Sequence, residues 1–431
     1  MEKITAQMEI NQDVSFKIKK NVENILDLKN EIEKVLERET SKIIETIFAG
    51  GISLNASDIH IEPEEEKVKI RARIDGILHD ILFIEFKTYH KLLSRIKLLS
   101  GIKLNITKKA QDGRFTILFD EKKIEIRTSV LPSKYEESIV MRILNPKKII
   151  EIEELGIRKD IFNQFEKEIK KPNGMIIVTG PTGSGKTTTL YAVLKRIQNP
   201  EIKIITIEDP IEYHLEEISQ TQVAPDKGYD FSNGLRAIVR QDPDVVLVGE
   251  IRDYETANIA LQAALTGHLV LTTLHTNDSA GTIARLQSLG EKPINIGPAM
   301  NIVIAQRLVR KVCKECVTFA PPLKEELEIF KKELSTLKER IEMPKLDKNL
   351  KIAKVNGCKS CNFTGYKERV GIFEFFLVDD EMENFILKSP SIADLRKIAR
   401  KKGMVLMRED GLIKVLKGET TLEEVNRVTE N

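Results

Sequence analysis

A glycine-rich segment in the middle of the 431-residue chain carries the clearest chemical pattern. The run GPTGSGKT fits the phosphate-binding pattern G-x-x-x-x-G-K-[ST] at every required position. In such a loop, backbone N–H groups wrap around phosphate oxygens, Lys186 reaches the β- and γ-phosphates, and the Thr187 hydroxyl ligates Mg²⁺. An apolar strand enters the loop and a helix leaves it, which favours anion binding over a glycine turn that binds nothing. The predicted nucleotide-binding residues are Gly180, Pro181, Thr182, Gly183, Ser184, Gly185, Lys186, Thr187 and Thr188.

Two acidic residues follow apolar runs of the kind that form buried strands. Ile204–Ile207 leads into Glu208, and Val245–Val248 leads into Gly249 and Glu250. Hydrolysis needs one carboxylate that holds Mg²⁺ and one that positions the attacking water. Because Gly249 stands where many nucleotide-hydrolysing families place the metal-holding Asp, we assign Glu250 to Mg²⁺, directly or through water, and Glu208 to the base. The opposite assignment stays open, as does a role for either acid as a helix cap or salt-bridge partner.

Two histidines bracket a third apolar run, LVLTTL. His268 precedes this run and His275 follows it. A side chain that senses the γ-phosphate would lie at such a strand end, but a solitary histidine is also a common structural group. The residues alone leave both interpretations open.

The four cysteines of the chain form two C-x-x-C pairs, Cys313 with Cys316 and Cys358 with Cys361. Four thiolates suit a closed, tetrahedral, structural Zn²⁺ site. The 41 residues between the pairs exceed the roughly 15–20 of a zinc ribbon, and a charged helical segment accounts for the extra length. A redox-active dithiol is the alternative.

The elements that must position these residues follow from hydrophobic patterning. IIVTG, KIITIED, DVVLVGE and HLVLTTLH are continuous apolar runs that alternate with helices, which predicts an α/β fold with a parallel sheet covered on both faces. Before them, DIHIEP, KVKIRARID, RFTILFD and KKIEIRTSV alternate with period two and predict strands. TYHKLLSRIKLLSG predicts a helix ending at Gly101, and helical spacing predicts another over residues 29–49.

These patterns divide the chain into segments. The C-terminal tail is expected to be helical, with breaks at Gly403, Gly411 and Gly418. The predicted divisions are a short helical segment 1–40, an α+β domain 41–145, a linker 146–155, an α/β core 156–310, a tetracysteine zinc module 311–375 and a helical tail 376–431.

Composition narrows the functional classes. Lys and Arg number 68 against 66 Asp and Glu, so the net charge is only +2. This balance, the 5% aromatic content and the absence of Trp argue against direct binding of nucleic acid. The apolar stretches are a few residues long, against the roughly 20 that span a bilayer, and the first residues lack the apolar region of a signal peptide. We therefore expect a cytoplasmic protein without a transmembrane segment.

Several motifs together carry a resemblance to a known family. GPTGSGKTTTLY, ITIEDPIEY, LRAIVRQDPDVVLVGEIRD and TGHLVLTTLHTND resemble the four signature boxes of the secretion ATPase superfamily, and more narrowly those of the type II secretion and type IV pilus-assembly ATPases. SDIHIEP, RARIDG, AQDGR and IRTSVLPS are similar to the second N-terminal domain of that family, and GMVLMREDGLIKVLKGETTLEEVNRVT to its C-terminal end. The resemblance covers roughly residues 41–431.

The resemblance implies a RecA-like P-loop NTPase core in a homohexamer. Such a motor hydrolyses ATP and drives insertion of pilin or pseudopilin subunits through an inner-membrane platform protein, so it lies peripherally on the inner membrane. The resemblance also implies that Glu208, Glu250, His268 and His275 work at the nucleotide site. Arg127 and Arg142 match arginines that the family places at the phosphates across a domain or subunit boundary. Without the resemblance, these two arginines are simply charges on a strand surface. The residues expected to act in catalysis are Lys186, Glu208, Glu250, His268, His275, Arg127 and Arg142.

The resemblance also implies an assembly-type motor, because the same four-cysteine module is found in assembly-type members of the family and is lacking in the retraction-type ones. Only about forty residues precede the match, where many relatives carry an additional docking domain, so secretion, piliation and DNA uptake all stay open as pathways. Two other classes remain as alternatives: a nucleotide-binding scaffold or regulator without productive turnover, and a DNA-translocating ATPase.

Overall fold

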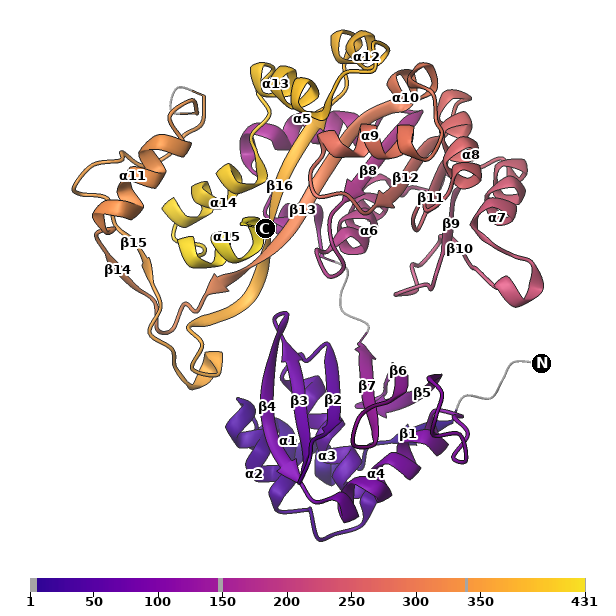
Figure 1. Ribbon diagram of the computed structural model, residues 1–431, viewed down its shortest axis with the longest axis vertical. Helices are drawn as coiled ribbons and strands as arrows, with labels where there is room; N and C mark the ends of the chain where they lie inside the picture. Colours follow the sequence, from indigo (N-terminus) through magenta and orange to yellow (C-terminus); the bar gives the residue numbers. More distant parts are fainter. Residues whose placement is uncertain (1–5, 146–149, 338–339, 431) are drawn as a thin grey trace. The chain divides into compact units, whose positions relative to one another are not determined.

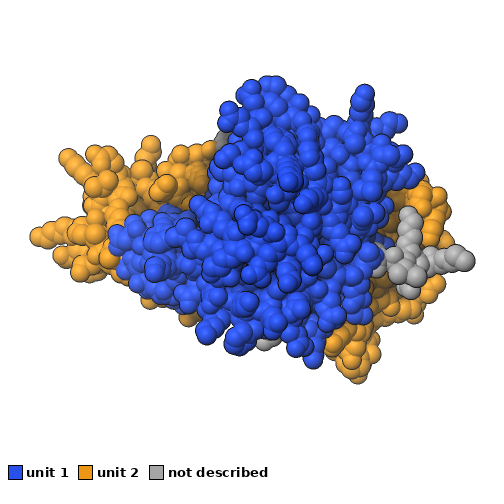
Figure 2. Space-filling model, turned by 90° about the horizontal axis from the view of Figure 1, so that it is seen from below, with its two compact units in different colours: residues 1–147, 313–317, 355–368 blue, residues 148–312, 318–354, 369–431 orange. Residues whose placement is uncertain are grey.

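The computed structural model describes residues 6–145, 150–337 and 340–430. The chain forms two compact units (Figures 1 and 2). The first unit comprises residues 1–147, 313–317 and 355–368, and the second comprises residues 148–312, 318–354 and 369–431.

The first unit is built on a sheet with the strand order β1-β5-β6-β7-β2-β3-β4. Its strands are β1 (Gln7–Glu9), β2 (Asp58–Pro63), β3 (Val68–Ile74), β4 (Ile77–Ile84), β5 (Gln111–Phe119), β6 (Lys122–Pro132) and β7 (Glu137–Leu144). β1 runs parallel to β5, and the other paired strands are antiparallel. In β3, every second residue is buried and the residues between are partly exposed, because side chains alternate between the two faces of a strand. The four alternating segments found in the sequence are all strands.

The helices of the first unit are α1 (Gln12–Asn21), α2 (Ile25–Glu33), α3 (Thr40–Ser53) and α4 (Phe86–Leu99). The prediction of α4 is confirmed, and Gly101 after it has a φ of 69°, which favours glycine. The prediction of one helix over residues 29–49 is wrong, since the chain turns between α2 and α3. The turn brings Leu28 onto α3 at Gly50, where a Cβ atom would lie 2.1 Å from Leu28 Cδ1.

The second unit is built on a sheet with the order β10-β9-β11-β12-β8-β13-β16. Its strands are β8 (Gly174–Thr179), β9 (Ile204–Glu208), β10 (Ser219–Gln222), β11 (Val245–Val248), β12 (Leu269–Leu274), β13 (Met300–Val312) and β16 (Tyr366–Leu377). From β10 to β13 the neighbouring strands are parallel. All residues of β8, β11 and β12 are buried. Met175 and Ile177 of β8 pack into one core and Ile176 and Val178 into another, so both faces are covered and the predicted α/β fold is confirmed.

Helices and short elements surround this sheet (Figure 1). The helices are α5 (Lys159–Ile169), α6 (Lys186–Ile197), α7 (Phe231–Ile238), α8 (Tyr254–Leu265), α9 (Ala280–Ser288), α10 (Pro293–Ala299), α11 (Lys324–Glu333), α12 (Asp380–Ile386), α13 (Ile392–Lys401), α14 (Met407–Leu416) and α15 (Leu422–Thr429). The small strands are β14 (Thr318–Ala320) and β15 (Ile352–Lys354), and the 3₁₀ turns are η1 (Ile152–Leu155), η2 (Pro225–Lys227), η3 (Val239–Gln241) and η4 (Lys359–Cys361).

The glycines of the tail behave differently from one another. Gly403 and Gly418 follow α13 and α14 with φ values of 111° and 73°, so both end a helix as expected. Gly411 instead lies inside α14, and a Cβ atom there would come within 2.8 Å of Val425. The predicted break at Gly411 is therefore wrong, because this glycine serves close packing between α14 and α15.

Two of the expected segments, the linker 146–155 and the module 311–375, do not form separate parts of the described structure. Within the expected linker 146–155, residues 146–149 lie outside the described residues. The remainder includes η1, whose Ile152 and Leu155 are buried in the second unit. The expected module 311–375 is divided: both cysteine pairs belong to the first unit, and residues 318–354 belong to the second.

Candidate nucleotide site

The glycine-rich loop joins the buried strand β8 to α6. Gly180, Gly183 and Gly185 have φ values of 146°, 79° and 89°, a region that side chains with a Cβ atom rarely adopt. Lys186 is the first residue of α6, so the positive end of the helix dipole faces the loop. The hydroxyl of Ser184 is buried and has no hydrogen-bond partner among the described residues. A helix N-terminus and a buried hydroxyl without a partner among the described residues suit a phosphate.

Lys186 lies across this loop. Its Nζ donates to the carbonyl oxygens of Gly180 at 2.9 Å and Pro181 at 3.2 Å. Burial lowers the pKa of Lys186, and the nearby charge of Glu250 opposes that shift. Thr187 follows as the second residue of α6, so the lysine and the hydroxyl both belong to the first turn of the helix. This pair can supply the cation and the Mg²⁺ ligand that the sequence predicts.

Glu250, His275 and Lys186 come together beside the loop. Glu250 follows β11 with its side chain 15% exposed, and His275 Nε2 lies 3.6 Å from Glu250 Oε2. Burial lowers the pKa of His275, and the positive charge of Lys186 lowers it further. Arg252 Nη2 donates to Glu250 Oε1 at 2.5 Å. Sequence reasoning missed Arg252, although it belongs to the GEIRD motif.

Glu208 occupies a different environment at the end of β9. It is 3% exposed and accepts hydrogen bonds from the hydroxyl of Tyr191 on α6, from Thr206 Oγ1 at 2.6 Å and from Gln220 Nε2 at 3.2 Å. Burial raises the pKa of Tyr191, and the Glu208 charge raises it further. Two of these bonds use Oε1 and one uses Oε2. A carboxylate has about four acceptor positions, so these three bonds leave one position on Oε2 unused by the described residues.

The two histidines lie at opposite ends of β12. His275 follows the strand at the P-loop edge, since Leu274 pairs with Thr179 directly before Gly180. His268 precedes the strand, and its backbone carbonyl accepts from the Gly174 N–H at 3.1 Å. A six-residue strand is about 20 Å long at roughly 3.3 Å per residue. The structure therefore brings His275 to the loop of its own chain and does not bring His268 there.

Arg127 and Arg142 are direct neighbours in the sheet of the first unit. The pairing register connects Arg114, Arg127, Arg142, Asp58 and Arg73 across β5, β6, β7, β2 and β3. Directly paired residues point to the same face, so these side chains form one row, here called the arginine row. Asp58 is buried, and its two oxygens lie 3.2 Å from Arg142 Nε and 3.5 Å from Arg73 Nε.

Sequence reasoning missed two members of the arginine row. Arg114 lies in the AQDGR motif and Arg73 in the RARIDG motif, so the motifs were visible but the register that aligns them was not. The row belongs to the first unit, whereas the P-loop belongs to the second.

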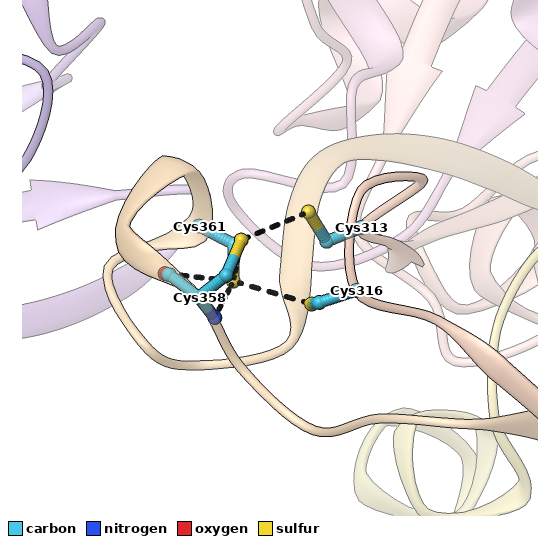
Figure 3. Close-up of side chains that lie close together, drawn as sticks. All are labelled: Cys313, Cys316, Cys358 and Cys361. Carbon is cyan, nitrogen blue, oxygen red and sulfur yellow. Dashed lines mark hydrogen bonds between the residues drawn. The ribbon is translucent and has the colours of Figure 1, made fainter.

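The four cysteine sulfurs cluster in the first unit (Figure 3). All four Sγ atoms lie within 4.8 Å of one another, with separations of 3.9 Å for Cys313–Cys358, 3.8 Å for Cys316–Cys361 and 3.7 Å for Cys358–Cys361. Tetrahedral ligands at a Zn–S distance of about 2.3 Å are about 3.8 Å apart. The backbone N–H groups of Cys358 and Gly365 donate to Cys361 Sγ. The donor set therefore fits a Zn²⁺ ion.

The close packing of the four sulfurs also affects their ionisation. Burial, together with hydrogen bonds to the neighbouring cysteines, raises the pKa of Cys316 to about 12. Several thiols packed this closely ionise together only when a positive charge compensates them.

Comparison with known proteins identifies the family. Residues 32–427 match the family described as "Type II/IV secretion system protein". The chain is 43% identical over 390 residues to the type IV pilus assembly ATPase PilB of Thermus thermophilus, covering 90% of this chain and 43% of that protein. It is 41% identical over 412 residues to the type II secretion system protein E of Xanthomonas campestris, covering 95% of this chain and 70% of that protein.

Solved structures agree with this assignment. The pilus retraction motor PilT with bound ADP is 27% identical, with a TM-score of 0.59 over 89% of this chain and 96% of that one. The Legionella pneumophila ATPase DotB, 24% identical, shares the fold with a TM-score of 0.66 over 91% of this chain and 96% of that one. In the part of the chain that the structure describes, no helix combines the length and apolarity needed to cross a membrane. From its matched sequence and its fold, the chain belongs to the type II/IV secretion system protein family, the family of the secretion and pilus-assembly ATPases.

Proposed function

We propose that this secretion-family ATPase couples ATP hydrolysis to the assembly of a type IV pilus or a type II secretion pseudopilus. The observation that carries the proposal is the grouping of Lys186, Glu250 and His275 beside the P-loop. The names of the Thermus and Xanthomonas relatives supply the two pathways. The motor works as a homohexamer, and it meets the inner membrane through a platform protein.

The nucleotide site performs the first part of this function. Backbone N–H groups of the P-loop bind the phosphates, Lys186 reaches the β- and γ-phosphates, and Thr187 helps to hold Mg²⁺. When bound, the ion neutralises charge on the phosphate oxygens. Glu250, whose charge acts on Lys186, takes part in holding the ion. Glu208 is fixed by three donors, and these described partners leave one of its acceptor positions unused, which suits a base that orients the attacking water.

The arginine row supplies the remaining positive charge. Phosphoryl transfer spreads negative charge over three equatorial oxygens, and the planar fork of an arginine binds two oxygens at once. Arg142 keeps 55% of its side chain exposed although Asp58 holds its Nε atom. Arg127 and Arg142 are therefore proposed to reach the phosphates from another domain or subunit.

The zinc site is structural in this proposal. Cys313, Cys316, Cys358 and Cys361 fill a tetrahedral shell, which leaves no open position for chemistry at the metal.

A phosphate-release assay on the purified protein tests the enzymatic part. Lys186→Ala should abolish turnover and weaken ATP binding, because the γ-phosphate loses its cationic contact. Lys195→Ala is the matched control, since Lys195 lies on the same helix and pairs with Glu151 at the surface. Absence of turnover in the unsubstituted protein, with ATP bound, would support a nucleotide-binding scaffold instead.

Co-purification tests the membrane part. The protein, held with a slowly hydrolysed ATP analogue, should retain an inner-membrane protein that Lys186→Ala protein retains poorly. Stimulation of turnover by DNA, without such a partner, would favour a DNA-translocating motor.

A further inference from the structure

The segment between β12 and α9, residues 275–279, is attached to the P-loop strand at its start. The Thr276 N–H donates to Thr179 Oγ1 at 2.9 Å, and the two hydroxyl oxygens lie 2.7 Å apart. Thr179 is completely buried and directly precedes Gly180. The residue after His275 is therefore fixed to the strand that enters the phosphate loop.

The other end of this segment is attached to a strand almost a hundred residues away. Ser279 donates its N–H to Glu374 Oε1 at 3.0 Å and its hydroxyl to the same oxygen. Glu374 lies on β16, and its second oxygen accepts from the Met407 N–H at 3.4 Å. Met407 is the first residue of α14. One carboxylate thus joins the start of α9, the strand β16 and the start of α14.

A second link leads from the same segment to α13. Asp278 Oδ1 accepts from the Gly281 N–H at 2.7 Å, and Oδ2 accepts from Arg396 Nη2 at 2.6 Å. Arg396 belongs to α13, and α9 and α13 pack together (Figure 1). The 275–279 segment therefore contacts both the end of β8, which leads into the nucleotide loop, and the C-terminal helices.

Glu374 is costly to bury. It is 3% exposed, burial raises its pKa, and the hydrogen bonds from Ser279 favour the charged form. Two helix starts next to one carboxylate offset part of this cost. An apolar residue at this position would avoid the free-energy cost of burying a carboxylate. We therefore infer that Glu374 has a role beyond packing.

We propose that Glu374 is a positioning residue for ATP hydrolysis: by holding Ser279 it keeps His275 beside Glu250 and connects this segment to α14. The inference rests on the proposed roles of Glu250 and His275 at the nucleotide. It also means that a change at the nucleotide site can be transmitted to the C-terminal helices through the hydrogen bonds of Glu374.

Glu409 provides a matched control within the same region. It is 4% exposed, burial raises its pKa, and it accepts from the Leu406 N–H at 2.8 Å and from Arg400 at 2.6 Å. It therefore resembles Glu374 in burial and in binding the start of α14. Its hydrogen-bond partners Leu406 and Arg400 both belong to the C-terminal helical region.

The experiment compares kcat, the KM for ATP and the melting temperature of Glu374→Gln, Glu409→Gln and Ser279→Ala. Glutamine places an NH₂ donor opposite the N–H of Ser279 or Met407, so one of the two connections is lost. We expect Glu374→Gln to lower kcat about 10- to 100-fold while KM changes by less than about threefold. Glu409→Gln should lower the melting temperature to a similar extent and keep kcat within about twofold.

Ser279→Ala tests the same link from the other side. It removes the hydroxyl bond to Glu374 and keeps the backbone N–H bond, so it should also lower kcat, by no more than Glu374→Gln does. The two effects should be less than additive in the double variant, because both changes weaken the connection that Glu374 makes between Ser279 and Met407. Equal kcat values for Glu374→Gln and Glu409→Gln would overturn the proposal. If Glu374→Gln is insoluble, a normal kcat for Ser279→Ala overturns it instead.

Failure of the proposed function has a different signature. In that case Glu250→Gln itself keeps a normal rate, whatever the variants of Glu374 and Ser279 do. An inactive Glu250→Gln together with a fully active Glu374→Gln refutes only the positioning role.

Discussion

At the residue scale, two glutamates at neighbouring strand ends have different surroundings. Glu250 lies near Lys186 and His275, and Glu208 is buried under three hydrogen-bond donors. The register explains the contrast: Val248 pairs with Ile207, so Gly249 lies level with Glu208. Glu250, one residue further, points to the other side.

This difference leads to a prediction about magnesium. Glu208→Gln and Glu250→Gln should each slow hydrolysis at least about 100-fold while ATP still binds. Only Glu250→Gln should also raise the Mg²⁺ concentration needed for half-maximal rate, because only that variant loses a contact to the ion. Steady-state rates over a magnesium titration check this. If only Glu208→Gln raises the Mg²⁺ requirement, Glu208 holds the ion and Glu250 is the base. Near-normal rates in both variants would refute a catalytic role for either glutamate.

At the element scale, a buried carboxylate joins α15 to β13. Glu424 accepts from the Arg310 N–H at 3.1 Å and from Arg427 at 2.8 Å and 2.9 Å. Burial acts to raise the pKa of Glu424, but hydrogen bonds from Arg310 and Arg427 outweigh it and bring the pKa to about 2. This value lies below the ordinary value of about 4.3.

The lowered pKa of Glu424 predicts how stability depends on pH. Because the folded-state pKa is below the unfolded one, the stabilisation is complete above about pH 5 and is lost as pH falls toward about 2. Glu424→Gln should therefore reduce the free energy of unfolding by about 3 kcal/mol at pH 7, and the difference should shrink between pH 5 and pH 3. Urea unfolding measures it. Glu423→Gln, an exposed neighbour in the same first turn, should show neither effect.

The cysteine cluster gives a second prediction at this scale. Purified protein should hold about one zinc per chain. Cys313→Ser or Cys358→Ser should lower the melting temperature, whereas Ser360→Ala, between the ligands of the second pair, should not. The Ile25 N–H donates to Asn362 Oδ1 at 2.7 Å, so metal removal should also speed hydrogen exchange in α2. A metal-free protein of full stability would contradict the structural site.

At the scale of the whole molecule, the phosphate loop and the arginine row lie in different compact units. In the proposed mechanism the core offers Lys186 and Mg²⁺ to the γ-phosphate, and an added arginine is worth about 10³–10⁵ in rate in comparable enzymes. If the proposed hexamer forms, the arginines come either from the same chain or from a neighbouring one.

Mixing two inactive variants before ring assembly distinguishes these two cases. Lys186→Ala keeps its arginines and Arg127→Ala keeps its P-loop. If Arg127 acts across a subunit boundary, some mixed interfaces contain both parts and activity should partly return. A mixture of Lys186→Ala with Glu250→Gln is the control, since both changes affect one site and no rescue is expected. A mixture that stays inactive supports action within one chain, and full activity of Arg127→Ala and Arg142→Ala refutes both versions.

Local sequence patterns determined several features of this protein. The P-loop, the paired cysteines and the apolar strands are recognisable from residues only a few positions apart, because backbone freedom, ligand spacing and strand periodicity are local properties. The α/β fold and the family follow from them. Two predictions failed because they used only local patterns. The helical spacing of apolar residues continues across the turn between α2 and α3, and a glycine such as Gly411 is a common sign of a helix break.

Only the tertiary structure decided how distant residues meet. Sequence order places His268 and His275 close together, but a strand holds them at opposite ends. Ser279 and Glu374 are 95 residues apart and share a hydrogen bond, and Arg73 and Arg114 join Arg142 only through the sheet register. Such contacts depend on strand order and on the packing of helices against the sheet, and no period or spacing within a single segment encodes either of them.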